Sequence, residues 1–421
     1  MISELIWILP FVLLLGCIAV LPLVRKHWWE NNFMKVSAGL AAIIVLRYLF
    51  FLNAGETLVH TGFEYFSFIV LIGSLFIISG GIHIQVKGEA DPLVNCAFLL
   101  TGAILANFLG TTGASMILIR PWLRMNKHRL KPYHVVFFIF LISNIGGGLT
   151  PMGDPPLFLG YLKGVPFFWV LRNVWPIWLT ALGLLLLIFA VFDYLDFKKA
   201  PLKLQKEETL REEEWRLSGG HHILFLALVI GAVFLNHPPF LREALMIAAC
   251  VISYKTTSKK IHEANAFNLG PIKEVAILFA GIFATMIPAL EWLEHHAAEL
   301  GIQAPAQFFW GSGILSSVLD NAPTYLNFLS ASVGLLHPAP EGVTPSAVKY
   351  ILINHPDYIR AISAGSVFFG AVTYIGNGPN FLVKSIADQT KVKTPGFFAY
   401  FFQYSLLILI PIFALIGMIF F

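Results

Sequence analysis

The sequence predicts an all-α polytopic membrane protein with about eleven spans, two re-entrant hairpins and two broken helices, arranged as an inverted repeat. Three observations lead to this fold class: the composition, the apolar runs of span length, and one glycine- and proline-rich pattern that occurs twice. Of the 421 residues, 57% are hydrophobic and only 12% are charged. Such a composition is typical of membrane proteins and excludes an ordinary soluble fold.

Several apolar runs of about 20 residues are long enough to cross the roughly 30 Å hydrocarbon core of a bilayer as helices. They occupy residues 5–24, 36–52, 63–84, 170–192 and 398–421. The net charge is only +4, so the basic residues fit cytoplasmic loops and do not predict a nucleic-acid surface. The three cysteines are scattered through apolar segments without the spacing of a metal site or a disulfide framework.

The distribution of Lys and Arg predicts the orientation, because cytoplasmic loops carry the excess of positive charge. Loops 25–35, 120–131 and 254–260 are basic, whereas loops 53–62, 291–301 and 337–350 carry little positive charge. With the N-terminus outside, these assignments agree only if segments 92–119 and 304–335 return to the side from which they enter. Both segments have polar residues at their middle, which predicts two re-entrant hairpins with tips near the membrane midplane. We expect a bacterial inner (plasma) membrane.

The predicted organisation follows from these segments. Residues 1–62 form N-terminal spans, 63–192 a first repeat, 193–220 a cytoplasmic linker, 221–270 connecting spans, and 271–421 a second repeat. The first repeat holds the hairpin 92–119 and a broken helix at 133–163. The second holds the hairpin 304–335 and a broken helix at 357–390.

The repeated pattern is T-x-x-G-[DN]-x-P-x-F-L, which occurs in "LTPMGDPPLFL" (149–159) and in "VTYIGNGPNFL" (372–382). Thr150 matches Thr373, and Asp154 matches Asn377. Each copy follows a predicted hairpin, and the predicted orientation makes the first copy run outward and the second inward. These are the features of an inverted repeat, in which broken helices form the binding site of a transporter near the midplane.

Physical chemistry explains why a break in a membrane helix indicates function. Unwound backbone groups in lipid cost several kcal/mol each, so a break persists only where protein or a watery cavity covers it. Glycines permit the turns, and prolines stop the helix from re-forming. The freed carbonyl groups and half-helix ends can then bind ions. The stretch "SNIGGGLTPMGDPP" (143–156) is therefore interpreted as one half of a midplane binding site.

The hairpin tips "NFLGTTGAS" and "SVLDNAPT", together with the breaks "GGGLTPMGDPP" and "AVTYIGNGPN", resemble those of the ion transporter superfamily. The resemblance is greatest to NhaD-type sodium/proton antiporters, which are related to citrate/dicarboxylate and arsenite transporters, and it covers roughly residues 63–421. It implies an inverted-repeat transporter whose sodium-site candidates are Asn107, Thr111, Thr112, Asn144, Gly148 and Asp154 in the first half, and Asp320, Asn321, Thr324, Thr373, Asn377 and Asn380 in the second. Thr150 joins them as the match of Thr373. Gly110 stands opposite Asp320, so the two halves are electrically unequal.

Asp154 and Asp320 are the only acidic residues inside the four motifs. An ionisable side chain at membrane depth costs a few kcal/mol, so both are functional candidates by default. Carboxylate, amide and hydroxyl oxygens suit a hard cation such as Na⁺, and a carboxylate can carry a proton instead. We therefore predict sodium/proton exchange, in which Asp154 and Asp320 bind transported Na⁺ and not a structural metal. Asp320 carries the greater weight, because Asn377 indicates that an amide is tolerated at the position of Asp154.

Other interpretations accompany this prediction. Asp154 and Asp320 could cap the helices that follow them, and Lys163 and Lys384 are expected to reach the membrane interface.

The alternative function is ion-coupled transport of citrate or a dicarboxylate. We expect no enzyme, because no nucleophile and base face each other, and no ATP-driven pump, because no Walker lysine motif occurs. No cofactor is expected beyond the transported Na⁺ and H⁺. The expected partners are membrane lipid, a small cation or carboxylate and a second copy in a homodimer, with no nucleic acid.

Overall fold

The computed structural model of the 421-residue chain describes residues 5–85, 91–199, 216–235, 238–265, 267–296, 299, 301–337, 343–389 and 394–421. Most of the predicted cytoplasmic linker, residues 200–215, lies outside the described residues, as do residues 338–342 of a predicted external loop. Helix α8 continues to Lys199, so residues 193–199 of the predicted linker are helical, and Asp193 is fully buried on that helix.

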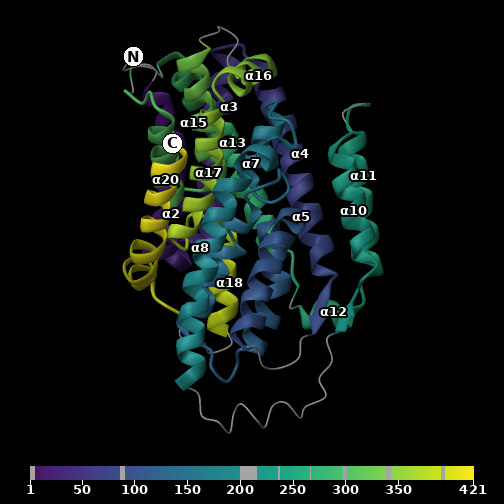
Figure 1. Ribbon diagram of the computed structural model, residues 1–421. Coiled ribbons are helices and arrows are strands. Elements are labelled where there is room, and N and C mark those ends of the chain that lie inside the picture. Colours follow the sequence, from purple (N-terminus) through teal and green to yellow (C-terminus); the bar gives the residue numbers. More distant parts are fainter. Residues whose placement is uncertain are drawn as a thin grey trace.

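The described chain is almost entirely helical (Figure 1). The first part contains η1 (Ile6–Ile8), α2 (Leu9–Val24), α3 (Lys26–Phe50), α4 (Gly55–Gly80), α5 (Pro92–Met125), α6 (Pro132–Leu141), η2 (Ile145–Gly147), α7 (Pro155–Leu162) and α8 (Trp169–Lys199). Three connecting helices follow: α10 (His222–Val233), α11 (Leu241–Thr256) and α12 (Lys259–Ala264). The last part contains α13 (Gly270–His296), α14 (Pro305–Val318), α15 (Asn321–Leu336), α16 (Pro345–Asn354), α17 (Pro356–Phe368), η5 (Phe369–Val372), α18 (Gly378–Gln389), α19 (Phe397–Tyr400), the π-helical η6 (Phe401–Leu409) and α20 (Ile410–Phe420).

One small sheet is an exception to the predicted all-α fold. Strand β1 (His83–Gln85) pairs antiparallel with β2 (Arg216–Ser218), with His83 opposite Ser218. The sequence offers no signal for these strands, because each has only three residues and their pairing joins positions on either side of the linker. The sheet ties the end of α4 to the start of the connecting helices.

Six described helices are long and apolar enough to cross a membrane: His27–Phe50, Gly55–Gly80, Pro92–Met125, Trp169–Lys199, Gly270–His296 and Phe397–Phe420. The chain is therefore an integral membrane protein of the all-α class. The first predicted run, residues 5–24, forms η1 and α2 and is shorter than these six.

Helix α5 doubles back on itself and is not a straight span. Gly110 has φ +73° and ψ 152°, in the middle of the element. This conformation has φ in the positive region that L side chains rarely adopt. On either side of it, Asn95 hydrogen-bonds Asn126 at 2.8 Å and the ring of Phe98 stacks on Trp122 at 5.4 Å. Since residues on opposite sides of Gly110 meet in pairs, α5 is a helical hairpin, with a second arm that runs past residue 119 to Met125.

Helices α14 and α15 form the second hairpin, with a turn at Leu319 and Asp320. The ring of Phe308 on α14 meets Phe328 on α15 at 5.9 Å, and a methyl group added at Gly311 would touch the same ring. The two arms therefore lie against each other as in the first hairpin.

Both predicted helix breaks are present. The first lies between α6 and α7, where only the short 3₁₀ turn η2 is helical, and the second lies between η5 and α18. In the first break the backbones of Gly147 and Gly153 touch so closely that a methyl group on either would overlap the other. Gly370 and Gly376 make the matching approach in the second. Gly147, Gly153 and Gly376 require glycine because two backbone segments pass each other there, and Gly370 leaves only a tight contact for a methyl group.

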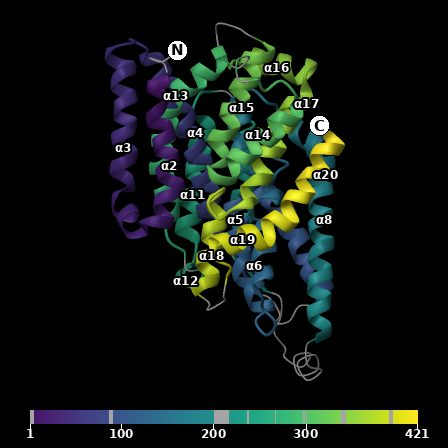
Figure 2. The same ribbon diagram turned by 90° about the vertical axis from the view of Figure 1, so that its left-hand side faces the viewer.

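The two halves interlock around the breaks. Helix α7 packs on α15, and α18 packs on α5, so the helix after each break contacts the hairpin of the other half. In Figures 1 and 2, which share their vertical axis, α6 lies low and α7 above it, whereas α17 lies above α18. Helices α2 and α3 flank the bundle beside α13, and α10 and α11 lie against α4.

Candidate ion-binding site

The carboxylate of Asp154 lies at the centre of the four motifs. The residue precedes α7 in extended backbone (φ −143°, ψ 143°), and its side chain is buried. Thr111 Oγ1 donates to Asp154 Oδ1 at 2.8 Å, Asn377 Nδ2 donates to the same oxygen at 3.2 Å, and Asn321 Nδ2 donates to Oδ2 at 2.5 Å. The side chain makes no capping bond to α7, so the interpretation of Asp154 as a simple helix cap is wrong.

The three donors come from three separate segments. Thr111 stands at the tip of the α5 hairpin, Asn321 at the tip of the α14–α15 hairpin, and Asn377 in the second break. The backbone N–H of Thr111 also donates to Gly153 O at 2.8 Å. Hairpin tips and breaks that lie far apart in the sequence thus meet at one buried carboxylate. The sequence predicts an ion site among these segments.

Asn107, Thr150 and Thr373 hold the backbone around this carboxylate and do not bond to it directly. Thr150 Oγ1 donates to Asn107 O at 2.5 Å and accepts from Gly153 N at 3.1 Å. Thr373 Oγ1 likewise donates to Ser317 O at 2.5 Å and accepts from Gly376 N at 3.2 Å. Each threonine therefore fixes its own break to its own hairpin by the same pair of bonds.

The Asn107 side chain bridges the first hairpin and the first break. Its Nδ2 donates to Gly146 O at 2.6 Å, and its Oδ1 accepts from Leu149 N at 3.0 Å. Both bonds satisfy backbone groups that the broken helix leaves unpaired, as buried polar groups require.

Asn144 and Asn380 join the two breaks to each other. Asn144 Nδ2 donates to Asn380 Oδ1 at 2.7 Å, and Asn380 Nδ2 donates to Gly370 O at 2.7 Å and Thr373 O at 2.9 Å. Two amide oxygens next to this network have no hydrogen-bond partner although they are buried: Oδ1 of Asn144 and Oδ1 of Asn321. Unpaired buried acceptors of this kind are uncommon and call for an explanation.

Asp320, Thr324 and Gly148 make no hydrogen bond to Asp154 among the described residues, although the Asp320 carboxylate is near enough to interact with it electrostatically. Asp320 caps α15 by accepting from Ala322 N at 3.0 Å, and its side chain is half-buried. Thr324 Oγ1 bonds to Asp320 O at 2.9 Å within the same turn. Gly148 packs against Phe368. The capping interpretation therefore applies to Asp320, and because capping and cation binding use the same oxygens, the prediction that Asp320 binds a cation stays a prediction.

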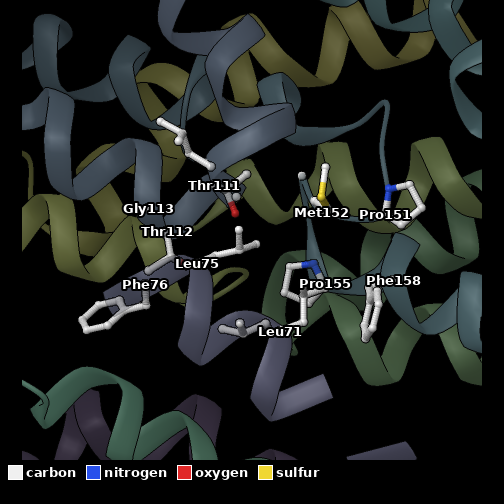
Figure 3. A pocket seen from close by; sticks show the side chains of 14 residues that line it. Leu71, Leu75, Phe76, Thr111, Thr112, Gly113, Pro151, Met152, Pro155 and Phe158 are labelled. Carbon is white, nitrogen blue, oxygen red and sulfur yellow. The ribbon is translucent and has the colours of Figure 1, made fainter. Parts of the chain in front are cut away.

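A cavity of about 30 Å³ lies beside the first hairpin tip (Figure 3). Thr111 and Thr112 from the tip, Met152 and Pro155 from the break, and Leu75 from α4 are among the residues that line it. A water molecule needs roughly 10–15 Å³ of such space. The cavity therefore has the size of one or two water molecules and not of an organic acid.

The basic residues near the breaks are paired elsewhere. Lys163 Nζ lies 2.8 Å from Glu64 Oε1, and Lys384 Nζ lies 2.5 Å from Asp388 Oδ2. Neither lysine contacts Asp154 or Asp320 in these pairs. Within the described residues, no group of three or more His, Cys, Asp or Glu side chains could hold a metal ion.

Sequence reasoning missed several residues that support the site. Ser143 O accepts from Asn377 Nδ2 at 3.2 Å, Trp178 Nε1 donates to Gly146 O at 3.2 Å, and Tyr400 Oη donates to Ala371 O at 2.8 Å. Ser143 could have been found, because it begins the first glycine-rich stretch and has a matching serine, Ser366, in the repeat. The two aromatic donors come from spans with no local signal.

A comparison with protein families gives one match, which extends over residues 2–421. It is to the CitMHS_2 family, described as "Putative citrate transport". The chain belongs to this transporter family. No curated protein matches it. Together with the helical membrane fold, the family makes the protein a secondary transporter and points to a non-enzyme.

Proposed function

We propose that the protein exchanges Na⁺ for H⁺ at Asp154, as a sodium/proton antiporter. The observation that carries the proposal is the environment of this carboxylate: hydroxyl and amide groups surround it, and two unpaired amide oxygens, of Asn144 and Asn321, belong to the same network. Hard cations prefer oxygen ligands of these kinds. No Lys or Arg bonds to Asp154 among the hydrogen bonds of the described chain, so a cation suits the site better than an anion does.

Exchange requires only that two cations compete for one group. A buried carboxylate is costly while charged and alone, so it binds either a metal cation or a proton. Bound Na⁺ excludes the proton, and a bound proton removes the charge that holds Na⁺. If Asp154 faces the two sides of the membrane alternately, the two gradients are coupled through this competition.

The proposed architecture is an NhaD-type inverted repeat of about eleven spans with two re-entrant hairpins. The doubled-back α5, the α14–α15 hairpin and the opposite directions of the two broken helices in Figures 1 and 2 support it. Rocking of one repeat against the other would expose a midplane site to each side in turn. The external N-terminus, the inner-membrane location, the homodimer and the repeat boundaries belong to this proposal.

The second candidate function is ion-coupled transport of citrate or a dicarboxylate, and the family match over the whole chain favours it. In that mechanism the cation at Asp154 would accompany or drive the organic anion. Pockets for drug-sized ligands have volumes of roughly 300–1,000 Å³. The cavity of about 30 Å³ beside the hairpin tip would have to widen greatly to admit citrate.

Purified protein in liposomes that enclose a pH-sensitive dye distinguishes the two candidates. The liposomes receive NaCl, LiCl, KCl or citrate in turn, and radiolabelled citrate uptake is measured in parallel. We expect a sodium gradient to move protons while citrate is not taken up. Citrate uptake without any sodium-driven change of interior pH would overturn the antiport proposal in favour of the second candidate.

A further inference from the structure

Tyr325 is exceptional among the buried tyrosines of the described chain. Tyr48, Tyr133, Tyr374 and Tyr400 each donate their hydroxyl to an acceptor: Glu291 Oε2, Asp193 Oδ1, Pro395 O and Ala371 O. The hydroxyl of Tyr325 is fully buried and donates to no carbonyl or carboxylate, and the one polar side chain within its reach is another hydroxyl, that of Ser363. An unpaired buried hydroxyl destabilises a protein, and a phenylalanine would fill the same space without that cost.

A serine with the same property faces it. Ser363 on α17 lies within hydrogen-bonding reach of the Tyr325 hydroxyl, and its own buried Oγ has no other partner. Other buried serines in these helices bond to a carbonyl of their own helix, as Ser366 does to Ile362 O at 2.6 Å and Ser332 to Leu329 O at 2.7 Å. Ser363 does not use this option, so the two hydroxyls between α15 and α17 have no partner apart from each other.

These hydroxyls lead directly to the candidate ion site. Tyr325 follows Asn321 by one turn of α15, about 6 Å along the helix axis and on the same face. Asn321 holds Asp154 through Nδ2, and its Oδ1 is the third unpaired buried atom on this side. Gly160 on α7 leaves room for the Tyr325 hydroxyl, because even a methyl group there would overlap it.

Polar groups continue from Ser363 along α17 toward the predicted outer side. One turn from Ser363 on α17, Arg360 has a buried Nε without a partner, and its Nη1 bonds to Asp357 Oδ1 at 2.8 Å. The Asp357 side chain is 53% exposed. Arg360 and Asp357 neutralise each other, so the outer end of the line has no net charge to attract Na⁺.

We propose that the Tyr325 and Ser363 hydroxyls, bridged by water, form the path by which protons travel between Asp154 and the outer side. A water molecule that bonds to Ser363 Oγ, Tyr325 Oη and Asn321 Oδ1 would have the two to four polar partners that buried water requires. A proton taken from hydronium outside passes along this line. Each hydroxyl accepts one proton as it gives up another, and the Asp154 carboxylate receives the last one as its Na⁺ leaves. The inference rests on the proposed sodium/proton exchange.

The test compares Tyr325→Phe and Ser363→Ala with wild type in proteoliposomes by two assays. Exchange of ²²Na⁺ for unlabelled Na⁺ at equal pH on both sides needs no proton, whereas sodium-driven proton movement needs the path. We expect each variant to keep ²²Na⁺ exchange within about twofold and to lose roughly a hundredfold or more in proton movement, the lower end of what a positioned proton-transfer group contributes. Tyr325→Phe should unfold at the same temperature as wild type or higher.

Tyr65→Phe is the matched control, because this hydroxyl donates to Ala276 O at 2.8 Å between α4 and α13. It should leave the ratio of the two assays unchanged. If the Tyr325 and Ser363 variants leave proton movement unchanged, or if both assays fall together, the path is overturned. If the wild-type protein itself moves no protons under a sodium gradient, the proposed function fails, and the path with it.

Discussion

The two hairpins match at their tips and differ at their bases. At the tips, Thr111 and Asn321 stand at equivalent positions and reach the same carboxylate, one at each oxygen of Asp154. Thr150 and Thr373 tie each break to its hairpin with the same bonds. The contacts of the two repeats are therefore most alike at the candidate site.

At the base of the first hairpin, a buried carboxylate joins the two arms to their neighbours. Asp193 on α8 accepts from Asn95 on the first arm at 2.8 Å, from Tyr133 on α6 at 3.0 Å, and from two nitrogens of Arg129, just beyond the second arm. At the second hairpin, Gln307 Oε1 accepts from Ala304 N at 2.9 Å, and Tyr358 donates to Gln303 O. Among the described residues no ion pair joins the arms of α14 and α15.

The two halves therefore differ in their charges and in how their hairpins are anchored. The first half holds the central charge and a charged anchor, and the second half contributes neutral donors on a hairpin without such an anchor. We therefore expect the second hairpin to move more during transport.

Asp154→Asn removes the carboxylate to which Thr111, Asn321 and Asn377 donate, and makes position 154 the same as its match, Asn377. The charge and the proton site are lost together, so sodium-driven proton movement should fall to the level of empty liposomes. The interior pH dye assay measures this. Exchange at the wild-type rate with unchanged pH dependence would remove the chemical basis of the antiport proposal.

The double variant Asp154→Asn with Asn377→Asp moves the carboxylate into the second half without leaving the site. Some sodium-driven proton movement should return, because the two side chains are hydrogen-bonded neighbours. It should stay below wild type, since an aspartate at 377 cannot donate to Ser143 O as Asn377 does. A folded but fully inactive double variant would mean that the carboxylate must lie in the first break.

Asp193→Asn should destabilise the protein by about 3–5 kcal/mol, because it removes the charge of a buried carboxylate that is ion-paired with the partly buried Arg129. Asp196→Asn is the control: its partner Lys131 is 52% exposed, so the loss should be about 0–1 kcal/mol. Thermal unfolding followed by tryptophan fluorescence in detergent measures both. Equal stability of the two variants would contradict the anchoring role of Asp193.

Thr150→Val and Thr373→Val should each cost about 1–3 kcal/mol, because each removes the hydroxyl that donates to a buried carbonyl. This shared bond predicts similar losses in both halves, and any excess should fall on Thr373→Val, since Gly153 N also donates to Thr150 O at 2.9 Å. Thr180→Val, which removes only a bond to Pro176 O within α8, should cost less. Clearly unequal losses for the two site threonines would show that the breaks are not equivalently supported.

Asp320→Asn should have the smallest effect. Asparagine caps a helix about as well as aspartate does, so the free energy of unfolding should change by no more than a few tenths of a kcal/mol. Proton movement should fall less than in Asp154→Asn. A complete loss of exchange in a stable Asp320→Asn protein would restore the order of importance that the sequence suggests.

Local signals were enough to predict the breaks and the turns of the hairpins. Glycines, prolines and polar residues in the middle of apolar runs mark the segments around Gly110, Asp154, Asp320 and Asn377, and the repeated pattern relates two of them. The sequence could not rank the two aspartates, because the ranking depends on backbone direction. Asp154 turns its side chain away from α7, whereas Asp320 turns its side chain back to Ala322 N.

The anchor and the sheet were not predictable for a related reason. Asp193 bonds to Asn95, which is 98 positions away, and β1 pairs with β2 across the linker. Nothing in the local sequence indicates either partner. Tyr325 was likewise indistinguishable from an ordinary core tyrosine until its surroundings could be compared with those of the others.

The distribution of donors around Asp154 also affects the order in which the protein can mature. Asn321 lies 167 positions and Asn377 lies 223 positions after Asp154. At synthesis rates of about 5–20 residues per second, roughly ten seconds or more pass between the appearance of the carboxylate and that of its later partners. During this interval Thr111 is the only side chain of the final set that has been made. A nascent first half must therefore keep Asp154 protonated or in contact with water until the second half arrives.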